Sequence, residues 1–375
     1  MLLQETHSIV TDERFWPSEL GGGRIFFSHG EGNARGEGTF ISKNVDFREL
    51  EVIRDNEGRA LFIILETNGT NICIGNVYCP NLSFDSNDKL NHEMFLESIH
   101  NTLNTAAQKY DDLNIILAGD FNMIMHTSLD ANGGNPTIYA QSINCMNKIA
   151  EDLNITDIFR SLYPQDRLIT FSPGGRNVRN IYRRLDYIWI PESWRSKVTE
   201  AEITPAFHSD HRIVKISFRK DSKIKGRGSW MHNDLLNDNT TYLEEFHDLF
   251  PSWTEEAKVL DDPRSRWEFL KFKIKCHSRD FSVRESKKKY EYRKNLETQL
   301  TKLEKDLAED TSNDDLIINY AKTKSLYDKI LTEDTNKLIF QARIKVYEQG
   351  EKSTAFFFRQ IKNNSAKANT VGSGY

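Results

Sequence analysis

The chain has 375 residues and a formal net charge of −5, with 50 Lys and Arg against 55 Asp and Glu. This length is typical of two domains rather than one. A content of 38% hydrophobic and 11% aromatic residues excludes an intrinsically disordered chain. No apolar stretch approaches the ~18 residues of a membrane span, and the first residues lack the pattern of a secretory signal.

Charge is distributed unevenly along the chain. Residues 1–219 hold 21 Lys and Arg against 29 Asp and Glu, a balance of −8, so residues 220–375 hold 29 against 26, a balance of +3. The four cysteines are Cys73, Cys79, Cys145 and Cys276. No two of them form a Cys-x-x-Cys pair, and their spacing does not suggest a disulfide framework. We therefore expect reduced thiols and a nuclear or cytoplasmic protein.

Residues 1–219 are predicted to combine several strands with a few helices. Two apolar runs flank Asn68-Gly69, a hairpin signal, and a short run before Asp120 is apolar throughout, as in a strand buried on both faces. The predicted strands are 60–67, 72–78, 114–119, 184–190 and 212–218, and helical spacing marks 88–110 and 138–153. Because many strands follow one another directly, the pattern favours antiparallel or mixed sheets covered by helices.

The second part of the chain is predicted to be helical. Residues 220–229 have the composition of a polar linker, and leucines recur at 4-3-4 spacing from Leu296 to Leu307. A polar break at 310–315 precedes a second amphipathic stretch around 317–331, so a helical hairpin is expected. Two interpretations remain open: a basic arm that contacts nucleic acid, or a solvated helix pair that packs on itself or on a partner.

Five short stretches place acidic, amide or imidazole side chains where a strand ends, a common place for functional sites. They are residues 3–7, 76–81, 119–122, 184–187 and 209–211. In an extended strand Asp120 and Asn122 would project together while Phe121 turns into the core. The alternative is an ordinary turn closed by a hydrogen bond to the Asp120 side chain.

An acid within an apolar strand, Asp186, needs a partner, because a buried carboxylate must be paired or neutralised. His211 is the natural candidate, although a structural histidine is the alternative. Together these residues form an oxygen-rich set without cysteine, which favours Mg²⁺ or Mn²⁺ over Zn²⁺. Such a set suits phosphodiester hydrolysis.

The ordered series Gln4-Glu5-Thr6, 76–81, 119–122, 184–187 and 209–211 resembles the endonuclease/exonuclease/phosphatase superfamily, which includes DNase I and the apurinic/apyrimidinic endonucleases. More narrowly, it resembles the endonuclease domain of LINE-type non-LTR retrotransposon polyproteins. The stretches most similar to that group are 117–122, 170–172 and 207–211. The resemblance implies a four-layer α/β sandwich of two mostly antiparallel sheets flanked by helices.

The second half is similar to the connector of those polyproteins, since residues 350–358 resemble the segment before the reverse transcriptase. The implied domains are an endonuclease domain at 1–219, a linker at 220–229, an α-helical connector at 230–369 and a disordered tail at 370–375. By this resemblance we expect an endonuclease plus connector without the reverse transcriptase of those polyproteins.

The resemblance also implies roles for single residues. Glu5 is similar to the metal-binding glutamate, and Asp210 is expected to add a contact to the metal or leaving group. Tyr78 corresponds to the active-site tyrosine near the phosphate. Asp120 is expected to orient or deprotonate the attacking water, with Asn122 on a phosphate oxygen.

Further roles concern orientation and DNA contacts. Asp186 is expected to orient His211, which would donate to the phosphate or act as an acid. Thr170, Ser209 and Asn81 are expected to contact the DNA or support the site.

Arginines gather between Thr170 and Asp186, on an expected hairpin over residues 172–184. In related endonucleases the equivalent hairpin is similar to a DNA-probing loop, and arginine suits phosphate and narrow-groove contacts. A solvated loop is the alternative. The arginines are Arg176, Arg179, Arg183 and Arg184.

One departure from the family pattern concerns the N-terminus. Family members begin with a strand that carries an Asn-x-x-Gly motif, whereas this sequence starts inside the following strand, so we expect an unpaired edge and a lost ligand. The expected function is a Mg²⁺-dependent DNA endonuclease that leaves a 3′ hydroxyl for target-primed reverse transcription, with element RNA as a further partner. The alternatives are an impaired remnant that only binds nucleic acid, and a phosphoesterase acting on a small phosphate ester.

Overall fold

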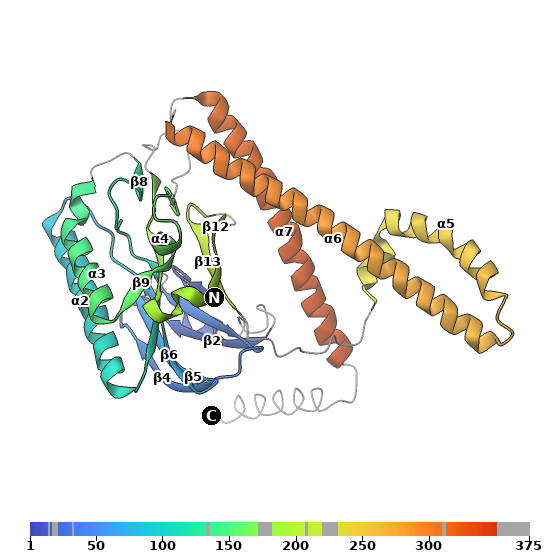
Figure 1. Cartoon of the computed structure of the whole chain (residues 1–375), viewed down its shortest axis with the longest axis horizontal. Coiled ribbons are helices and arrows are strands. Elements are labelled where there is room, and N and C mark those ends of the chain that lie inside the picture. The colour runs from blue at the N-terminus through green and yellow to red at the C-terminus, as the bar shows by residue number, and fades with distance from the viewer. Residues whose placement is uncertain are drawn as a thin grey trace, which may run out of the picture. The chain divides into compact units, whose positions relative to one another are not determined.

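The computed structural model describes residues 1–13, 16, 22–31, 34–132, 136–171, 182–206, 209–219, 232–309 and 313–350, with backbone only from 335 onwards (Figure 1). The chain divides into two compact units, which we describe separately. One contains residues 1–219 together with residues 305–317 and the part of the chain from residue 328 onwards. The other contains residues 232–304 and 318–327.

A six-stranded sheet forms the centre of the first unit. Its strands run in the order β4-β5-β6-β7-β11-β9. Their bounds are β4 Arg48–Arg54, β5 Ala60–Thr67, β6 Thr70–Tyr78, β7 Asn114–Asp120, β11 Asp186–Pro191 and β9 Ile155–Asp157. β6 and β7 pair in parallel and the other neighbours are antiparallel. The central position of β7 explains why its sequence is apolar throughout.

The hairpin predicted between β5 and β6 is confirmed. Thr67 lies opposite Thr70, which leaves Asn68 and Gly69 as a two-residue turn. Both have positive φ, 50° and 74°, the conformation that the favoured two-residue hairpin turns require and that Asn and Gly adopt most readily.

Two long helices cover one face of this sheet (Figure 1). They are α2 (Ser86–Lys109) and α3 (Ala140–Asp152), close to the predicted bounds. Asp85 caps α2 by accepting a hydrogen bond from the backbone amide of Asn87 at 2.7 Å. The core between helices and sheet includes Phe62, Val77, Leu96, Ile99, Leu103, Leu117 and Met146.

Smaller sheets cover the opposite face. β2 (Gly23–Ser28) and β3 (Glu37–Ser42) pair, and β1 (Leu2–Leu3) adds to β3. Phe26 and Ile41 from these strands pack on Leu61, Ile63 and Leu65 of β5. β12 (Val198–Pro205) and β13 (Arg212–Phe218) form a second pair, which packs with α4 (Ile158–Leu162) against β11.

The mixed α/β fold is therefore confirmed. The second layer, predicted as one sheet, consists among the described residues of two sheets that share no strand. Strand patterns predict which residues are extended, but partner choice depends on side-chain packing in the folded molecule. The remaining short elements are β8 (Ala131–Asn132), which pairs with β10 (Tyr182–Arg183), and 3₁₀ turns at Val10–Asp12, Pro136–Tyr139, Glu192–Lys197 and Asp234–Asp238.

Three helices follow: α5 (Thr240–Ala257), α6 (Pro263–Glu309) and α7 (Asp314–Gly350). The predicted break between the two long helices is confirmed. Within the second unit the Tyr327 hydroxyl donates to Glu297 over 3.1 Å, and Tyr242 bonds Ser278 between α5 and α6 over 2.8 Å. The helices thus pack on one another, and contact with nucleic acid stays a prediction.

Among the described helices, none is both long and apolar enough to cross a bilayer. The predicted linker, residues 351–358 of the predicted connector motif and the C-terminal tail lie outside the described residues.

Candidate active site

Three predicted site residues lie side by side where neighbouring strands of the central sheet begin or end. Tyr78 ends β6 and is the register partner of Asp120, which ends the parallel strand β7. Asp186 begins β11 and lies opposite Asp120 in the antiparallel pair. Neighbouring strands are ~5 Å apart, so this register brings a hydroxyl and two carboxylates together from distant parts of the sequence.

His211 joins this row from the segment before β13. The backbone amide of Arg212 donates to the carbonyl of Thr170 over 2.7 Å, and the Phe171 and His211 backbones form an isolated bridge. The imidazole Nδ1 lies 2.9 Å from Oδ2 of Asp186, and Nε2 lies 3.8 Å from Oδ2 of Asp120. The predicted partnership of Asp186 and His211 is present.

The electrostatics of this cluster are governed by burial and by the two carboxylates. Burial, reinforced by the charge of Asp186, raises the pKa of Asp120 to about 8. Burial lowers the pKa of His211, but the hydrogen bond and charge of Asp186, with the charges of Asp120 and Asp210, outweigh it and raise that pKa to about 9. At neutral pH the imidazole is therefore cationic and Asp120 tends to hold a proton in the metal-free protein.

The segment after Asp120 is a turn and not a continued strand. β7 ends at Asp120, Asn122 has a positive φ of 48°, and the Asn122 amide donates to Oδ1 of Asp120 over 2.8 Å. Of the two alternatives, the turn closed by a hydrogen bond to the Asp120 side chain is present and the extended Asp120–Asn122 pair is not, because this local hydrogen bond competes with the extended form. Phe121 is buried as predicted, and the Asn122 side chain donates to the carbonyl of Cys79 over 2.8 Å.

Gly119 allows β7 to approach β6 closely. Its φ is +141°, and a Cβ atom here would lie 2.0 Å from the carbonyl oxygen of Val77. Only glycine fits without moving one of the two strands, which explains the glycine immediately before Asp120.

The N-terminal segment brings Glu5 to Tyr78, whose hydroxyl donates to Oε1 of Glu5 over 2.5 Å. Burial, followed by this bond, raises the pKa of Tyr78. Gln4 donates to Oδ1 of the buried Asn76 over 2.5 Å, and Asn76 donates to the carbonyl of Leu3 over 3.0 Å. These bonds tie the N-terminal strand to β6.

The other predicted site residues occupy different environments. Thr170 is fully buried, and its hydroxyl accepts hydrogen bonds from the backbone amides of Leu185 (2.9 Å) and Asp186 (3.1 Å). Ser209 and Asp210 are exposed beside His211, and the Ser209 hydroxyl accepts from the His211 amide over 3.0 Å. The last predicted positions are the exposed Asn81, and Arg176 and Arg179, which lie outside the described residues.

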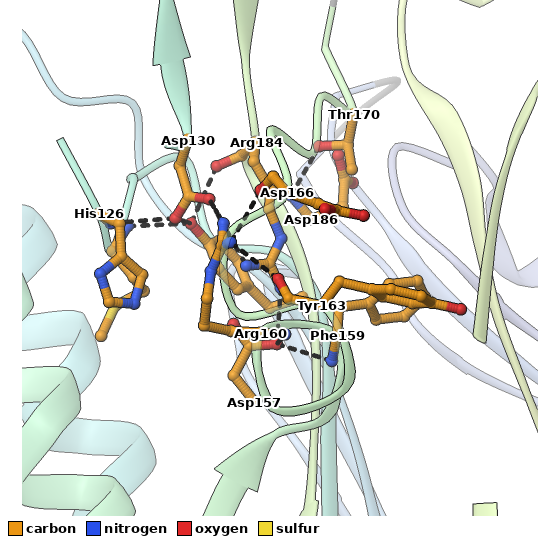
Figure 2. Close-up of polar contacts among 12 residues, drawn as sticks. His126, Asp130, Asp157, Phe159, Arg160, Tyr163, Asp166, Thr170, Arg184 and Asp186 are labelled. Carbon is orange, nitrogen blue, oxygen red and sulfur yellow. Dashed lines mark hydrogen bonds and ion pairs between the residues drawn. The ribbon is translucent and has the colours of Figure 1, made fainter. Parts of the chain in front are cut away.

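Two arginines predicted on the DNA-facing hairpin are buried instead. Arg183 is 5% exposed and Arg184 is 0% exposed, so neither is placed to reach DNA. Arg184 bonds Asp157 over 2.6 Å and lies 3.6 Å from Asp130 (Figure 2). A buried guanidinium requires such carboxylates, and no periodicity in the sequence signals their convergence.

The ion pairs around Arg184 form a network below the Asp186 segment. Arg160 bonds Asp130 over 2.5 Å, and Asp130 also accepts from the His126 amide over 3.0 Å (Figure 2). The amide of Arg184 donates to the carbonyl of Asp130 over 2.8 Å. The network therefore fixes the chain two residues before Asp186.

Three residues that the sequence reasoning missed also belong to this region. The Arg59 guanidinium lies over the Tyr78 ring at 5.4 Å, and Glu37 is a fully buried acid. His92, fully buried on α2, bonds the carbonyl of Phe121 over 2.9 Å. His92 had a signal, because Leu96 lies four residues further along the apolar helix face, whereas Glu37 and Arg59 had none.

A cation fits the chemistry of these residues. Asp120, Asp186 and His211 each offer one ligand atom, and these three atoms lie within 4.8 Å of one another. Among the described residues, this is the group of acids and histidines that is close enough to surround an ion. Glu5 and Asp210, the predicted ligands, are not in that group. However, the charge of Glu5 acts on Asp120, and carboxylate oxygens are suitable ligands for hard cations.

The family model of the endonuclease/exonuclease/phosphatase family matches residues 1–211. The chain belongs to this family. The class of reaction is therefore hydrolysis of phosphate ester bonds.

Among solved structures, the chain is similar to the AP endonuclease LMAP from Leishmania major, with 22% identity and a TM-score of 0.49 over 58% of this chain and 78% of that one. It is also similar to the 3′ phosphatase NExo from Neisseria bound to product DNA hairpin, with 18% identity and a TM-score of 0.48 over 58% of this chain and 88% of that one. A third similar structure is an AP endonuclease from Archaeoglobus fulgidus, with 19% identity and a TM-score of 0.46 over 58% of this chain and 87% of that one.

Proposed function

We propose that this chain is a divalent-cation-dependent DNA endonuclease of retrotransposon origin. The observation that carries the proposal is the row formed by Tyr78, Asp120 and Asp186, with His211 between the two carboxylates. The ancestry is supported by the motif stretches at 117–122, 170–172 and 207–211, which resemble LINE-type endonucleases.

His211 is proposed to stabilise the scissile phosphate. Its imidazole is half-buried, cationic at neutral pH and oriented by Asp186, so its Nε2–H is available for a phosphate oxygen. A charged donor in a partly dry site stabilises the added negative charge of the transition state more than that of the ground state.

Asp120 is proposed to orient the attacking water and to deprotonate it in the cation-bound protein, where the positive charge would favour the ionised carboxylate. The Asn122 amide occupies one of its oxygens, Oδ1, and Oδ2 faces His211. Tyr78 and Asn122 flank this position from β6 and from the turn after β7. Glu5, Asp120 and Asp210 are proposed to hold Mg²⁺ or Mn²⁺, which when bound would neutralise phosphate charge.

The test is a nicking assay on supercoiled plasmid with Mg²⁺ and with EDTA. We expect Mg²⁺-dependent nicks, and a loss of ~10²-fold or more in Asp120→Ala and in His211→Ala. Glu57→Gln, an exposed acid outside the site, is the control and should nick normally. Unchanged nicking in both alanine variants contradicts the assignment.

The nature of the ends tests the proposed role in priming. Nicks with a 3′ hydroxyl and a 5′ phosphate can be sealed by DNA ligase and extended by a polymerase, and we expect both. Hydrolysis of a small phosphate ester without nicking would favour the phosphoesterase alternative. DNA retention in a mobility-shift assay without cleavage would favour the impaired remnant.

A further inference from the structure

His92 is a fully buried histidine on α2, and both nitrogens of its ring have partners. Nε2 lies 2.9 Å from the backbone carbonyl oxygen of Phe121, and Nδ1 lies 3.0 Å from the hydroxyl oxygen of Ser142 on α3. Phe121 directly follows Asp120 at the end of β7. A helix side chain thus reaches the turn that carries a proposed catalytic carboxylate, although the proposed chemistry does not use it.

The two partners of the ring decide which nitrogen carries the proton. A carbonyl oxygen can only accept, so Nε2 holds a hydrogen and donates it to Phe121. Burial lowers the pKa of His92 to about 4, so the ring is neutral at physiological pH and Nδ1 accepts from the hydroxyl of Ser142. Ser142 therefore stabilises the tautomer in which His92 donates to the turn.

The turn after Asp120 has four consecutive backbone polar groups, and each has a defined partner. The Asp120 carbonyl accepts from the residue after β6, and the Phe121 amide donates to the residue before β11, both over 2.9 Å. The Asn122 amide donates to Oδ1 of Asp120 over 2.8 Å. The Phe121 carbonyl is the fourth group, and its donor, His92, is the one partner of the four that comes from a helix.

The bond from His92 acts on the same peptide group that contacts the Asp120 carboxylate. The Phe121 carbonyl and the Asn122 amide belong to one peptide group, which is planar, so its two ends move together. His92 holds the oxygen end, and Oδ1 of Asp120 accepts from the N–H end. Asn122 also has a positive φ of 48°, a sparsely populated conformation that depends on the surrounding contacts. Without the donor the buried carbonyl would be unsatisfied, which favours rotation of this peptide group.

We propose that His92 is a positioning residue that fixes the Phe121–Asn122 peptide group and, through it, the direction of the Asp120 carboxylate. The inference rests on the proposed function, because that function assigns the attacking water to Asp120. The Asn122 amide then holds Oδ1, which leaves Oδ2 facing His211. The two helices thus do more than cover the sheet, since a chain of hydrogen bonds runs from α3 through His92 to the turn.

The test compares replacements of His92 that keep the donor with replacements that remove it. In His92→Gln the side-chain amide can reach the Phe121 carbonyl, in His92→Asn it is one methylene too short, and His92→Leu has no donor. We expect kcat for nicking to fall about tenfold or more in the leucine and asparagine variants, a size known for residues that orient a functional group from behind. His92→Gln should retain most of the wild-type kcat. KM for DNA should not change, because the lost bond is not made to the substrate.

A second readout does not depend on activity. NMR of the EDTA-treated full chain follows hydrogen exchange at the Asn122 amide, which reports the bond to Asp120. We expect protection of this amide to be lost in His92→Leu and kept in His92→Gln. A wild-type chain that does not nick DNA overturns the proposed function, and the Asn122 amide still decides whether His92 fixes the turn.

His100→Leu is the matched control. His100 lies further along α2 and connects this helix to α3 rather than to the turn, since its Nε2 lies 3.1 Å from Oδ2 of Asp152. Its removal should leave kcat and the protection of Asn122 at wild-type values.

Circular dichroism checks the fold of every variant. Wild-type kcat or wild-type protection of Asn122 in a folded variant that lacks the donor overturns the proposal. Equal losses in His92→Gln and His92→Leu also overturn it, because the donor would then have no part in the effect. So does the failure of both His92→Leu and His92→Asn to fold, since His92 would then serve stability alone.

Discussion

His211 donates its Nδ1–H to Asp186 over 2.9 Å, although 25 residues separate the two in the sequence. The bond holds the imidazole with Nε2 directed toward Asp120, 3.8 Å away. One imidazole thus lies between two carboxylates from neighbouring strands, and this arrangement raises the pKa values of both His211 and Asp120.

Asp186→Asn should lower the pKa of His211 from about 9, because it removes the hydrogen bond and the charge that sustain it. Nicking at neutral pH should fall by ~10²-fold or more. NMR titration of the His211 ring measures the pKa directly. Asp210→Asn should shift it less, because Asp210 is exposed and contributes the smallest of the four raising effects. An equal shift in the two variants would contradict the assigned pair.

The stability of the metal-free protein should fall as pH rises from about 6 to 9. The pKa of Asp120 is about 8 in the folded chain and ~4 in an unfolded one, so the folded state binds more protons in this range. His211 acts in the same direction, since its stabilising effect is complete below pH ~6.5 and is lost through pH about 9. Denaturation in EDTA at several pH values checks this. Mg²⁺ should reduce the decline, and Asp120→Asn should flatten it.

His92 should make the fold sensitive to acid. Burial lowers its pKa to about 4, so the unfolded state binds more protons between pH ~6.5 and 4, and stability is lost as pH falls through this window. The full effect is about 3 kcal/mol at ~1.4 kcal/mol per pKa unit. His92→Gln should remove this part of the pH dependence in urea denaturation. A slope identical to that of the wild type would count against it.

Arg184→Met should destabilise the first unit by ~3–5 kcal/mol, because Asp157 would remain buried without its cation and Asp130 would keep only Arg160. Urea denaturation measures the loss. Arg48→Met is the matched control, since Arg48 pairs with Glu66 at the surface, and it should cost less than ~1 kcal/mol. Similar losses of unfolding free energy in both variants would contradict the prediction that the buried ion pairs contribute more to stability than the exposed one.

Gly119→Ala should lower the rate of nicking more than it lowers the affinity for DNA measured without Mn²⁺. The added Cβ would collide with the Val77 carbonyl and force β7 away from β6, which separates Asp120 from Tyr78. We expect a loss of ~10²-fold in nicking, the typical cost of displacing a reacting group by ~1 Å. Gly69→Ala is the control, as its Cβ would meet nothing within 4 Å, although its positive φ costs ~1 kcal/mol.

Much of the candidate site could be predicted because its residues follow strand ends. Asp120 and Asp186 are acids next to apolar runs, and His211 precedes one, so local pattern was sufficient to select them. Asn122 was only partly foreseen. Its residue type marks the position, but the choice between strand and turn depends on a hydrogen bond to Asp120 that composition does not reveal.

The sequence by itself determined α2, α3, the break between α6 and α7, most strands of the central sheet, the Asn68-Gly69 turn and the members of the Asp–His pair, since these depend on local periodicity and on residue chemistry. Tertiary structure alone decided that Tyr78, Asp120 and Asp186 share one register line, that Arg183 and Arg184 are buried, and that Glu37 lacks a donor. The reason is physical. Strand partners and buried charges are selected by contacts between segments far apart in the chain, and no local window of the sequence contains both sides of such a contact.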